Sequence, residues 1–381
     1  MQISPPIHLS LALAFAPGIG PIQFLQITAK FPNLIEFFSV DQKQLQAWGI
    51  PDKAIPAILQ PDQHKIEQHL NWAQVQGNAI LTLSDPRYPA ALKQIYAPPP
   101  VLFIQGNIEA LSLPALSIVG TRNPTFSGKE DAFYFARALA EHGYVINSGL
   151  ALGIDAAAHE GALSAEGITL AIMGTGFDRI YPIRHKSLAD AILEKGALIS
   201  EFPLGTPVKP ENFPRRNRVI SGLSIGVLVI EAALRSGSLI TARNALEQGR
   251  DVYAMPGSIH NPLAKGCHHL LKQGAKLVES IDDLLEEIPQ DLSPVPVKPI
   301  SYPGAGVSNN EVNPPSSPQT LDDKLVSLLK CLDFIPTTFD SIVARSGFAI
   351  AETAVLLSRL ELAGLIVREG GRYSKINNGV G

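Results

Sequence analysis

A chain of 381 residues has room for two or three domains, and its formal net charge of −4 offers no overall basic surface to a polyanion. Hydrophobic residues make up 45% of the chain and charged residues 17%, the balance of an ordinary globular protein. The two cysteines, Cys267 and Cys331, exclude a disulfide framework and favour a reducing compartment. The apolar run from Leu9 to Ala16 ends at Pro17-Gly18 and is too short to span a bilayer. We therefore expect a cytoplasmic protein without a signal peptide or a membrane segment.

Residues 1–70 are expected to form short helices around apolar positions such as Leu11, Phe24 and Phe38. The turn Pro17-Gly18-Ile19-Gly20-Pro21 resembles the glycine hairpin of SAM/helix-hairpin-helix-like domains, in which backbone amides can face a DNA phosphate. The region carries four Lys/Arg and five Asp/Glu. That balance favours a simple helix–helix turn over a DNA contact.

Residues 71–288 are expected to form the main domain. From residue 115, short apolar runs alternate with helical patterns. The expected strands are Leu116–Val119, Tyr144–Ser148, Thr169–Met173, Leu198–Ser200, Val227–Ile230 and Val252–Met255. The expected helices are Ser127–His142, Asp155–Ala165, Lys186–Lys195 and Leu239–Gln248. This alternation predicts an α/β domain with an extended Rossmann-like parallel sheet, whose ligands bind beyond the carboxyl ends of the strands.

Two further segments follow the main domain. Residues 289–319 are rich in proline and serine and are expected to be a linker. Residues 320–378 show three helical patterns and then two short strands around Gly370-Gly371, which predicts a winged-helix-like domain. The segment 320–381 holds seven Lys/Arg and seven Asp/Glu, so a packing or protein-binding role is at least as well supported as duplex binding.

Phosphate-compatible residues recur where the predicted strands end. They are Gly120, Arg122, Ser148, Gly149, Ser236, Gly237, Ser238 and Thr241, together with a helix start at Ser127-Gly128-Lys129. Glycines let the backbone approach a ligand closely, and helix starts offer free amides to an anion. Each feature alone is explained equally well by an ordinary turn or helix cap. Because the carboxyl ends of parallel strands share one edge, together they predict a phosphate-binding rim.

The segment Phe213-Pro214-Arg215-Arg216-Asn217-Arg218 places three arginines within four residues of an acidic chain. It precedes the apolar run Val219-Ile220, which looks like a buried strand, and the segment itself fits a loop or a first helical turn. The guanidinium group presents a planar fork of donors that suits phosphate oxygens. The segment therefore predicts a polyanion site on a rigid scaffold.

Other chemistry is weakly supported. Asp155 and His159 lie one helical turn apart, but a helix cap and an interior histidine explain them better than an acid–base pair. Cys267-His268-His269 has a single cysteine and adjacent histidines, a poor spacing for zinc. We expect no metal and no cofactor.

Seven segments in this order resemble the DNA-processing protein A family, also called Smf. They are IVGTRNP at 118–124, SGLALGID at 148–155, MGTGFDRIYP at 173–182, SEFPLG at 200–205, FPRRNRVISGLS at 213–224, EAALRSGSLITA at 231–242 and GRDVYAMPG at 249–257. The resemblance is strong over residues 115–288, and the flanking regions fit the family's common architecture. It implies a homodimeric single-stranded DNA-binding protein, not an enzyme, that protects incoming DNA and loads the RecA recombinase during natural transformation.

Carried over by motif, the resemblance implies backbone contacts from Arg122 and from Phe213 to Arg218. Gly149 and Ser236-Gly237-Ser238 should line the same groove. Phe213 is a candidate for stacking on a base, with a buried anchor as the equal alternative. The three arginines of the segment cannot all face DNA, so we expect one of them to pair with Glu201 or Glu231.

Two residues depart from the family pattern. Leu152 stands where the family usually has arginine, and Arg179 or Arg184 is a possible replacement. His268 stands at a position that is commonly asparagine. The rival interpretation is a nucleotide-binding enzyme of the phosphoribohydrolase type, related to lysine-decarboxylase-like proteins. It is disfavoured because Pro256-Gly257 is not followed by the catalytic glutamate of that family's motif.

Overall fold

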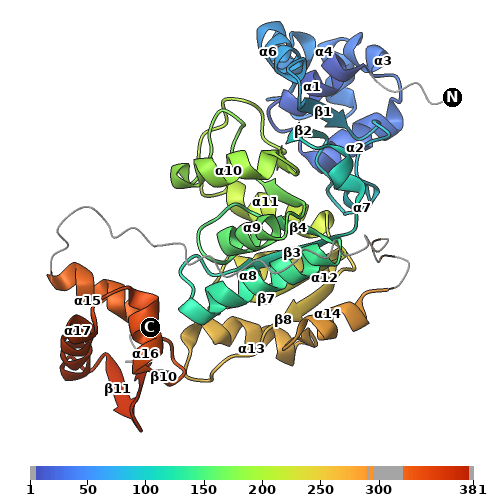
Figure 1. Ribbon diagram of the computed structural model, residues 1–381. Coiled ribbons are helices and arrows are strands. Elements are labelled where there is room, and N and C mark those ends of the chain that lie inside the picture. Colours follow the sequence, from blue (N-terminus) through green and yellow to red (C-terminus); the bar gives the residue numbers. More distant parts are fainter. Residues whose placement is uncertain (1–5, 290–291, 293, 295–320, 377–381) are drawn as a thin grey trace.

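The computed structural model describes residues 6–289, 292, 294 and 321–376. Figure 1 shows a group of helices near the N-terminus, a large sheet flanked by helices, and a small C-terminal domain. The predicted linker at 289–319 falls almost entirely outside the described residues. The domain boundaries stay predictions.

The N-terminal region is helical, as expected. Its helices are α1 (Ile7–Phe15), α2 (Pro21–Lys30), α3 (Leu34–Phe38), α4 (Gln42–Ala47), α5 (Ile55–Leu59) and α6 (Gln63–Ala73). Side-chain caps fix several starts, since Asn33, Asp41 and Asp62 each accept a backbone N–H from the first turn of the following helix. Gly18 has a φ of 89° in the turn between α1 and α2, and the side chain of Lys53 covers it.

A nine-stranded sheet forms the centre of the described part of the chain. Its strands are β1 (Asn78–Thr82), β2 (Val101–Gly106), β3 (Ala115–Gly120), β4 (Val145–Ser148), β5 (Thr169–Ile172), β6 (Ala197–Ser200), β7 (Gly226–Ile230), β8 (Asp251–Ala254) and β9 (Lys276–Leu277). The order is β1-β2-β6-β5-β4-β3-β7-β8-β9. The expected strands are present as β3 to β8 and are mutually parallel, which confirms the predicted sheet. The sequence prediction missed β1 and β2, which run antiparallel at one edge, and β9 at the other.

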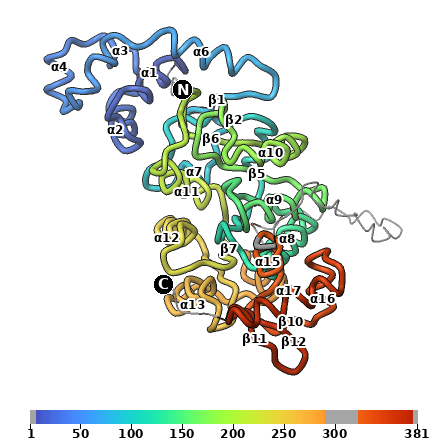
Figure 2. The backbone as a smooth tube through the Cα atoms, turned by 90° about the vertical axis from the view of Figure 1, so that its left-hand side faces the viewer, coloured from blue at the N-terminus to red at the C-terminus, as the bar shows by residue number. Residues whose placement is uncertain are grey.

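Helices cover both faces of the sheet (Figures 1 and 2). On one face lie α8 (Phe126–Glu141), α9 (Ile154–Ser164), α10 (Lys186–Leu193) and α14 (Ile281–Glu287). On the other lie α7 (Ala90–Lys93), α11 (Asn212–Gly222), α12 (Ser238–Glu247) and α13 (Lys265–Lys272). Short 3-10 turns are η1 (Glu109–Ser112), η2 (Ile183–His185) and η3 (Pro262–Ala264). The core of the second face continues without a break into the N-terminal helices, from Val229 through Leu92 to Leu13.

Helix α11 corrects one expectation. The run Val219-Ile220 is not a buried strand but the buried side of α11, which begins at Asn212 and holds all three arginines. Two adjacent apolar residues are compatible with either structure, and the four-residue spacing of the buried positions Arg216 and Ile220 decides it.

The C-terminal domain has its own apolar core. It consists of α15 (Leu321–Lys330), β10 (Thr337–Thr338), α16 (Phe339–Ser346), α17 (Ile350–Leu362), β11 (Ile366–Glu369) and β12 (Arg372–Lys375). The strands pair antiparallel in the order β10-β12-β11, and the β11–β12 turn uses Gly370 and Gly371 at φ values of 54° and 77°. This confirms the predicted winged helix. Figure 2 shows it beside α8.

In the described part of the chain, no single helix is long and apolar enough to cross a membrane. Of the helices that the structure describes, only α16 and α17, taken together across a bend of 108°, reach that length and hydropathy.

Candidate nucleic-acid interface

A cleft of about 640 Å³ opens at the carboxyl edge of the parallel strands. The turns after β3 and β7 form two of its walls, and the start of α11 forms a third. Its lining includes Gly120, Thr121, Arg122, Asn123, Asp155, Tyr181, Phe213, Arg216, Asn217, Arg235, Ser236, Gly237, Ser238 and Thr241. The structure thus brings most of the predicted rim together in one place.

Two residues beside this edge hold an uncommon backbone conformation. Leu150, just after β4, has a φ of 56°, and Glu231, just after β7, has a φ of 49°. Residues other than glycine rarely adopt a positive φ, and they keep this conformation only where the surrounding structure enforces it. The turns of this edge are therefore fixed in shape before any ligand arrives.

An exposed arginine lies against an aromatic pair at the mouth of the cleft. The guanidinium carbon of Arg122 lies 5.6 Å from the ring centroid of Phe213. The Phe213 ring lies 5.5 Å from that of Tyr181, whose side chain is 44% exposed. Phe213 is half-buried, so it is both an anchor and an accessible surface. The sequence prediction missed Tyr181, although it lies within the MGTGFDRIYP segment.

Arg216 lies at the floor of the cleft, where backbone carbonyl oxygens hold its guanidinium group. Its side chain is almost completely buried and donates hydrogen bonds to the carbonyl oxygens of Gly149 and Ile172. Burial lowers the pKa of Arg216 to about 10, although neighbouring Asp155 favours the charged form. Gly149 has no room for a side chain, because a Cβ would collide with this guanidinium group. Arg216 therefore forms part of the floor of the cleft, whereas Gly149, which was expected to line the groove, lies behind it and does not line the cleft.

Arg215 and Arg218 turn away from the cleft, and neither lines it. Their guanidinium nitrogens lie 3.0 Å and 2.6 Å from the same carboxylate oxygen of Glu201, which is buried. The expected pairing with Glu201 is therefore present. Glu231 makes no such pair: its carboxylate accepts the N–H and the hydroxyl of Thr125 instead.

The start of α12 forms the opposite wall. The hydroxyl oxygens of Ser236 and Ser238 lie 2.7 Å apart, and Gly237 between them is exposed. Asn217 donates its side-chain amide to the carbonyl oxygen of Gly237, which ties α11 to this turn. Arg235, exposed and adjacent, also lines the cleft. The sequence prediction missed Arg235, although it lies within the matched EAALRSGSLITA segment.

Some predicted residues lie away from the cleft. Ser148 is buried and donates its hydroxyl to the carbonyl oxygen of Ile118, so it links β4 to β3. Leu152 is half-buried, and neither Arg179 nor Arg184 lines the cleft in the place of a family arginine. The Nε of Arg179 instead lies 3.3 Å from a carboxylate oxygen of Asp178.

The possible acid–base and metal residues are engaged elsewhere. Asp155 accepts the N–H of Gly149, while the Nδ1 of buried His159 lies 2.6 Å from the hydroxyl of Thr169. Burial lowers the pKa of His159 to about 3 and raises the pKa of Cys267 to about 11. His268 Nε2 lies 3.0 Å from the carbonyl oxygen of Gly257. Among the residues that the structure describes, no group of three His, Cys, Asp or Glu is placed to hold a metal ion.

Family models match two parts of the chain. Residues 79–289 match the model of DNA recombination-mediator protein A, and residues 312–372 match the DprA winged helix domain. Protein Smf of Escherichia coli is 40% identical over 338 residues, which is 88% of each chain. DNA processing protein DprA of Bacillus subtilis is 45% identical over 59% of this chain and 76% of its own length.

Solved structures agree with this match. DNA processing protein A from Streptococcus pneumoniae has a TM-score of 0.66 at 36% identity, covering 76% of this chain and 99% of that one. DNA processing protein A from Helicobacter pylori has a TM-score of 0.50 at 31% identity, covering 54% and 94%. The latter structure is described as giving insight into a single-stranded DNA binding mode.

Proposed function

We propose that this chain, which belongs to the DNA recombination-mediator protein A (DprA/Smf) family, binds single-stranded DNA at the carboxyl edge of its sheet. The observation that carries the proposal is the exposed Arg122 over the Phe213–Tyr181 pair at the mouth of the cleft. Proteins that hold single strands combine cations along the backbone path with aromatic faces on which bases stack. This edge offers both within one rim.

In this proposal each wall of the cleft has a role. Arg122 and Arg235 are exposed on the cleft lining and supply donors for phosphate oxygens. The start of α12 adds two hydroxyls and the positive end of a helix dipole. Phe213 and Tyr181 offer ring surface to a base. Arg216 is a positioning residue, because its donors are used by carbonyl oxygens beneath the cleft.

Family membership also supports a wider role. We propose that the protein acts as a cytoplasmic homodimer that protects incoming single strands and loads the RecA recombinase on them.

A phosphoribohydrolase activity is not favoured, because Pro256-Gly257 lacks the following glutamate that this chemistry needs. Hydrolysis of a nucleoside monophosphate by the purified chain would argue for that activity. Light scattering tests the dimer, and strand exchange with added RecA tests the loading.

Fluorescence polarisation with a labelled oligo-dT tests the interface directly. Arg122→Glu should weaken binding about tenfold or more, because a hydrogen bond to a charged group contributes about 1.5–3 kcal/mol and the new carboxylate repels phosphate. The matched control is Arg137→Glu, an equal charge change at an exposed position of α8 outside the cleft lining. The slope of log affinity against log salt should fall by roughly 0.7 for each phosphate that the variant no longer neutralises.

Two results would count against the interface. Equal affinity of wild type and Arg122→Glu would remove the cleft as the binding site. Equal affinity of the wild type for duplex and single-stranded DNA would shift the assignment to the winged helix or to the hairpin at Gly18.

A further inference from the structure

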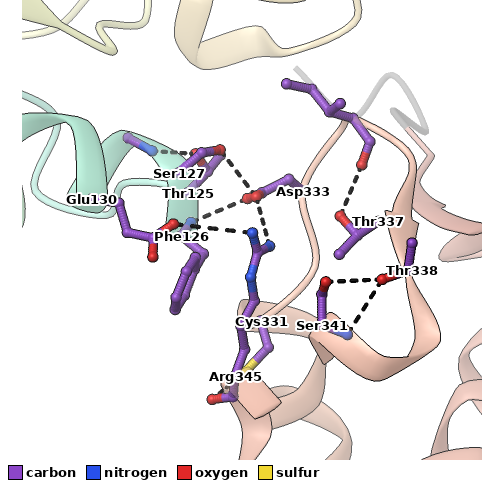
Figure 3. Close-up of polar contacts among 12 residues, drawn as sticks. Thr125, Phe126, Ser127, Glu130, Cys331, Asp333, Thr337, Thr338, Ser341 and Arg345 are labelled. Carbon is purple, nitrogen blue, oxygen red and sulfur yellow. Dashed lines mark hydrogen bonds and ion pairs between the residues drawn. The ribbon is translucent and has the colours of Figure 1, made fainter. Parts of the chain in front are cut away.

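The C-terminal domain contacts the main domain, which contains the large sheet, at the first turn of α8 (Figure 3). Asp333, in the loop between α15 and β10, is buried there although it carries a carboxylate. One carboxylate oxygen accepts the N–H of Phe126 at 3.1 Å, and the other accepts the hydroxyl of Ser127 at 3.0 Å. An acid from the C-terminal domain thus completes the cap of a helix more than two hundred residues earlier in the chain.

This helix start attracts an anion for general reasons. The first turn of a helix has amides without partners, and α8, at 16 residues, carries a full dipole. Thr125 satisfies the N–H of Gly128, which leaves the N–H of Phe126 for Asp333. The sequence pointed to this turn as a phosphate-compatible site, and the chain's own carboxylate occupies it.

Charged groups form the polar part of this contact. Arg345 donates to Asp333 at 3.2 Å, lies 4.0 Å from Glu130, and places its guanidinium carbon 4.2 Å from the centre of the Phe126 ring. Behind it, a cavity of about 90 Å³ lies between the two domains, with Asp131 among the core residues that line it. Salt weakens such contacts, whereas it would leave an apolar interface in place.

The same short segment connects this contact to the cleft. Thr121, Arg122 and Asn123 line the cleft, and Thr125 caps α8 immediately afterwards. Glu231 fixes the segment at both ends, because its carbonyl oxygen accepts the N–H of Thr121 and its carboxylate accepts the N–H of Thr125. A phosphate bound at Arg122 and the carboxylate of Asp333 would therefore lie on the same short segment, which runs from the turn after β3 into the start of α8.

We propose that the C-terminal domain is a detachable unit, held on the main domain by Asp333, and that its docking opposes DNA in the cleft. It is called the lid below because it closes the start of α8, although none of its described residues lines the cleft. The first part of the proposal, that Asp333 holds the domain in place, depends on the contacts alone. The second part, that docking opposes DNA binding, rests on the proposed function.

Release of the domain frees the N–H of Phe126 and opens the first turn of α8, next to the segment that carries Arg122, to an outside anion. Asp333 and Arg345 leave together, so the coupling comes from the freed helix start and not from a change in net charge. DNA binding and release of the lid then favour each other, as linkage requires.

Small-angle X-ray scattering of the full chain, at matched oligomeric state, tests the first part of the proposal. Asp333→Ala should increase the radius of gyration. The control is Asp340→Ala, which removes an equal charge from an exposed position of the same domain. The core-side double variant Ser127→Ala/Glu130→Arg should also extend the chain without altering the C-terminal domain. Unchanged scattering from Asp333→Ala and from the double variant would overturn the proposal.

Oligo-dT binding tests the coupling. Asp333→Ala should bind about fivefold more tightly than the wild type, the lower end of typical coupling between sites, while Asp340→Ala should not differ. An extended Asp333→Ala chain with unchanged affinity would overturn the lid. If neither wild type nor Asp333→Ala binds oligo-dT, the proposed function fails, while scattering still decides whether Asp333 holds the domain.

Discussion

Two helix starts at the carboxyl edge of the same sheet differ in what occupies them. The start of α12 is open, with exposed Gly237 between two serine hydroxyls on the lining of the cleft. The start of α8 is closed by Asp333 of the C-terminal domain. Both offer amides and a dipole to an anion. The difference teaches that a helix start can receive an outside anion only where the chain's own carboxylates leave it open.

The largest expected effect concerns the floor beneath the open start. Arg216→Met should destabilise the protein by about 3–5 kcal/mol, because it leaves Asp155 buried without its cation and two carbonyl oxygens without a donor. Denaturant unfolding measures this loss. Arg122→Met is the matched control, since Arg122 is exposed and its replacement should leave stability within about 0.5 kcal/mol. Equal stability of both variants would show that the floor does not depend on Arg216.

Closing the open start should produce the next largest effect. Ser236→Asp places a carboxylate beside the first turn of α12, as Asp333 does for α8. Affinity for oligo-dT should fall about tenfold, because the acid both caps the helix and repels phosphate. Ser236→Asn has similar size without charge and should retain most of the affinity. If Ser236→Asp binds DNA as tightly as the wild type, then the two helix starts do not differ in the way described.

The smallest effect is a pH dependence of the closed start. Burial, with Glu231, Glu130 and Asp333 adding to it, raises the pKa of Asp131 to about 6. Docking is therefore more favourable when Asp131 is protonated, and this contribution to the stability of the docked state is lost as the pH rises through about 6. On the C-terminal domain, burial lowers the pKa of Lys375, and the negative charges of Asp333 and Glu231 offset part of this shift.

Scattering in a salt titration measures this dependence. The wild-type lid should detach at lower salt at pH 7.5 than at pH 5.5, whereas Asp131→Asn should show little difference between the two. Identical midpoints for the wild type at both pH values would exclude Asp131 as the titrating group.

The rim was predictable because it depends on local rules. Alternating buried strands imply a parallel sheet, and a parallel sheet places Gly120, Arg122 and Ser236 to Ser238 at one edge. Strands β1 and β2 were missed because they precede the alternating pattern and pair antiparallel, which gives only a weak signal. Strand β9 was missed because it is only two residues long. The fold class therefore followed from periodicity, and the edges of the sheet did not.

The roles of individual arginines could not be predicted, because they depend on partners far away in the sequence. Arg215 and Arg218 pair with Glu201. Arg216 donates to the carbonyl oxygens of Ile172 in β5 and of Gly149 just after β4. Asp333 lies still further from its partner on α8. Composition shows that three arginines are present, and only the packed structure shows where their donors go.

The continuous apolar core has a consequence for how such a chain can change over time. Leu13 of the N-terminal helices and Val229 of the sheet belong to one cluster, whereas the winged helix encloses a separate one around Leu356. Deleting the N-terminal helices would strip the sheet of part of its own interior. The winged helix can be exchanged or lost at the cost of a few polar contacts. Among proteins descended from a common ancestor, we therefore expect the winged helix to vary more than the N-terminal helices.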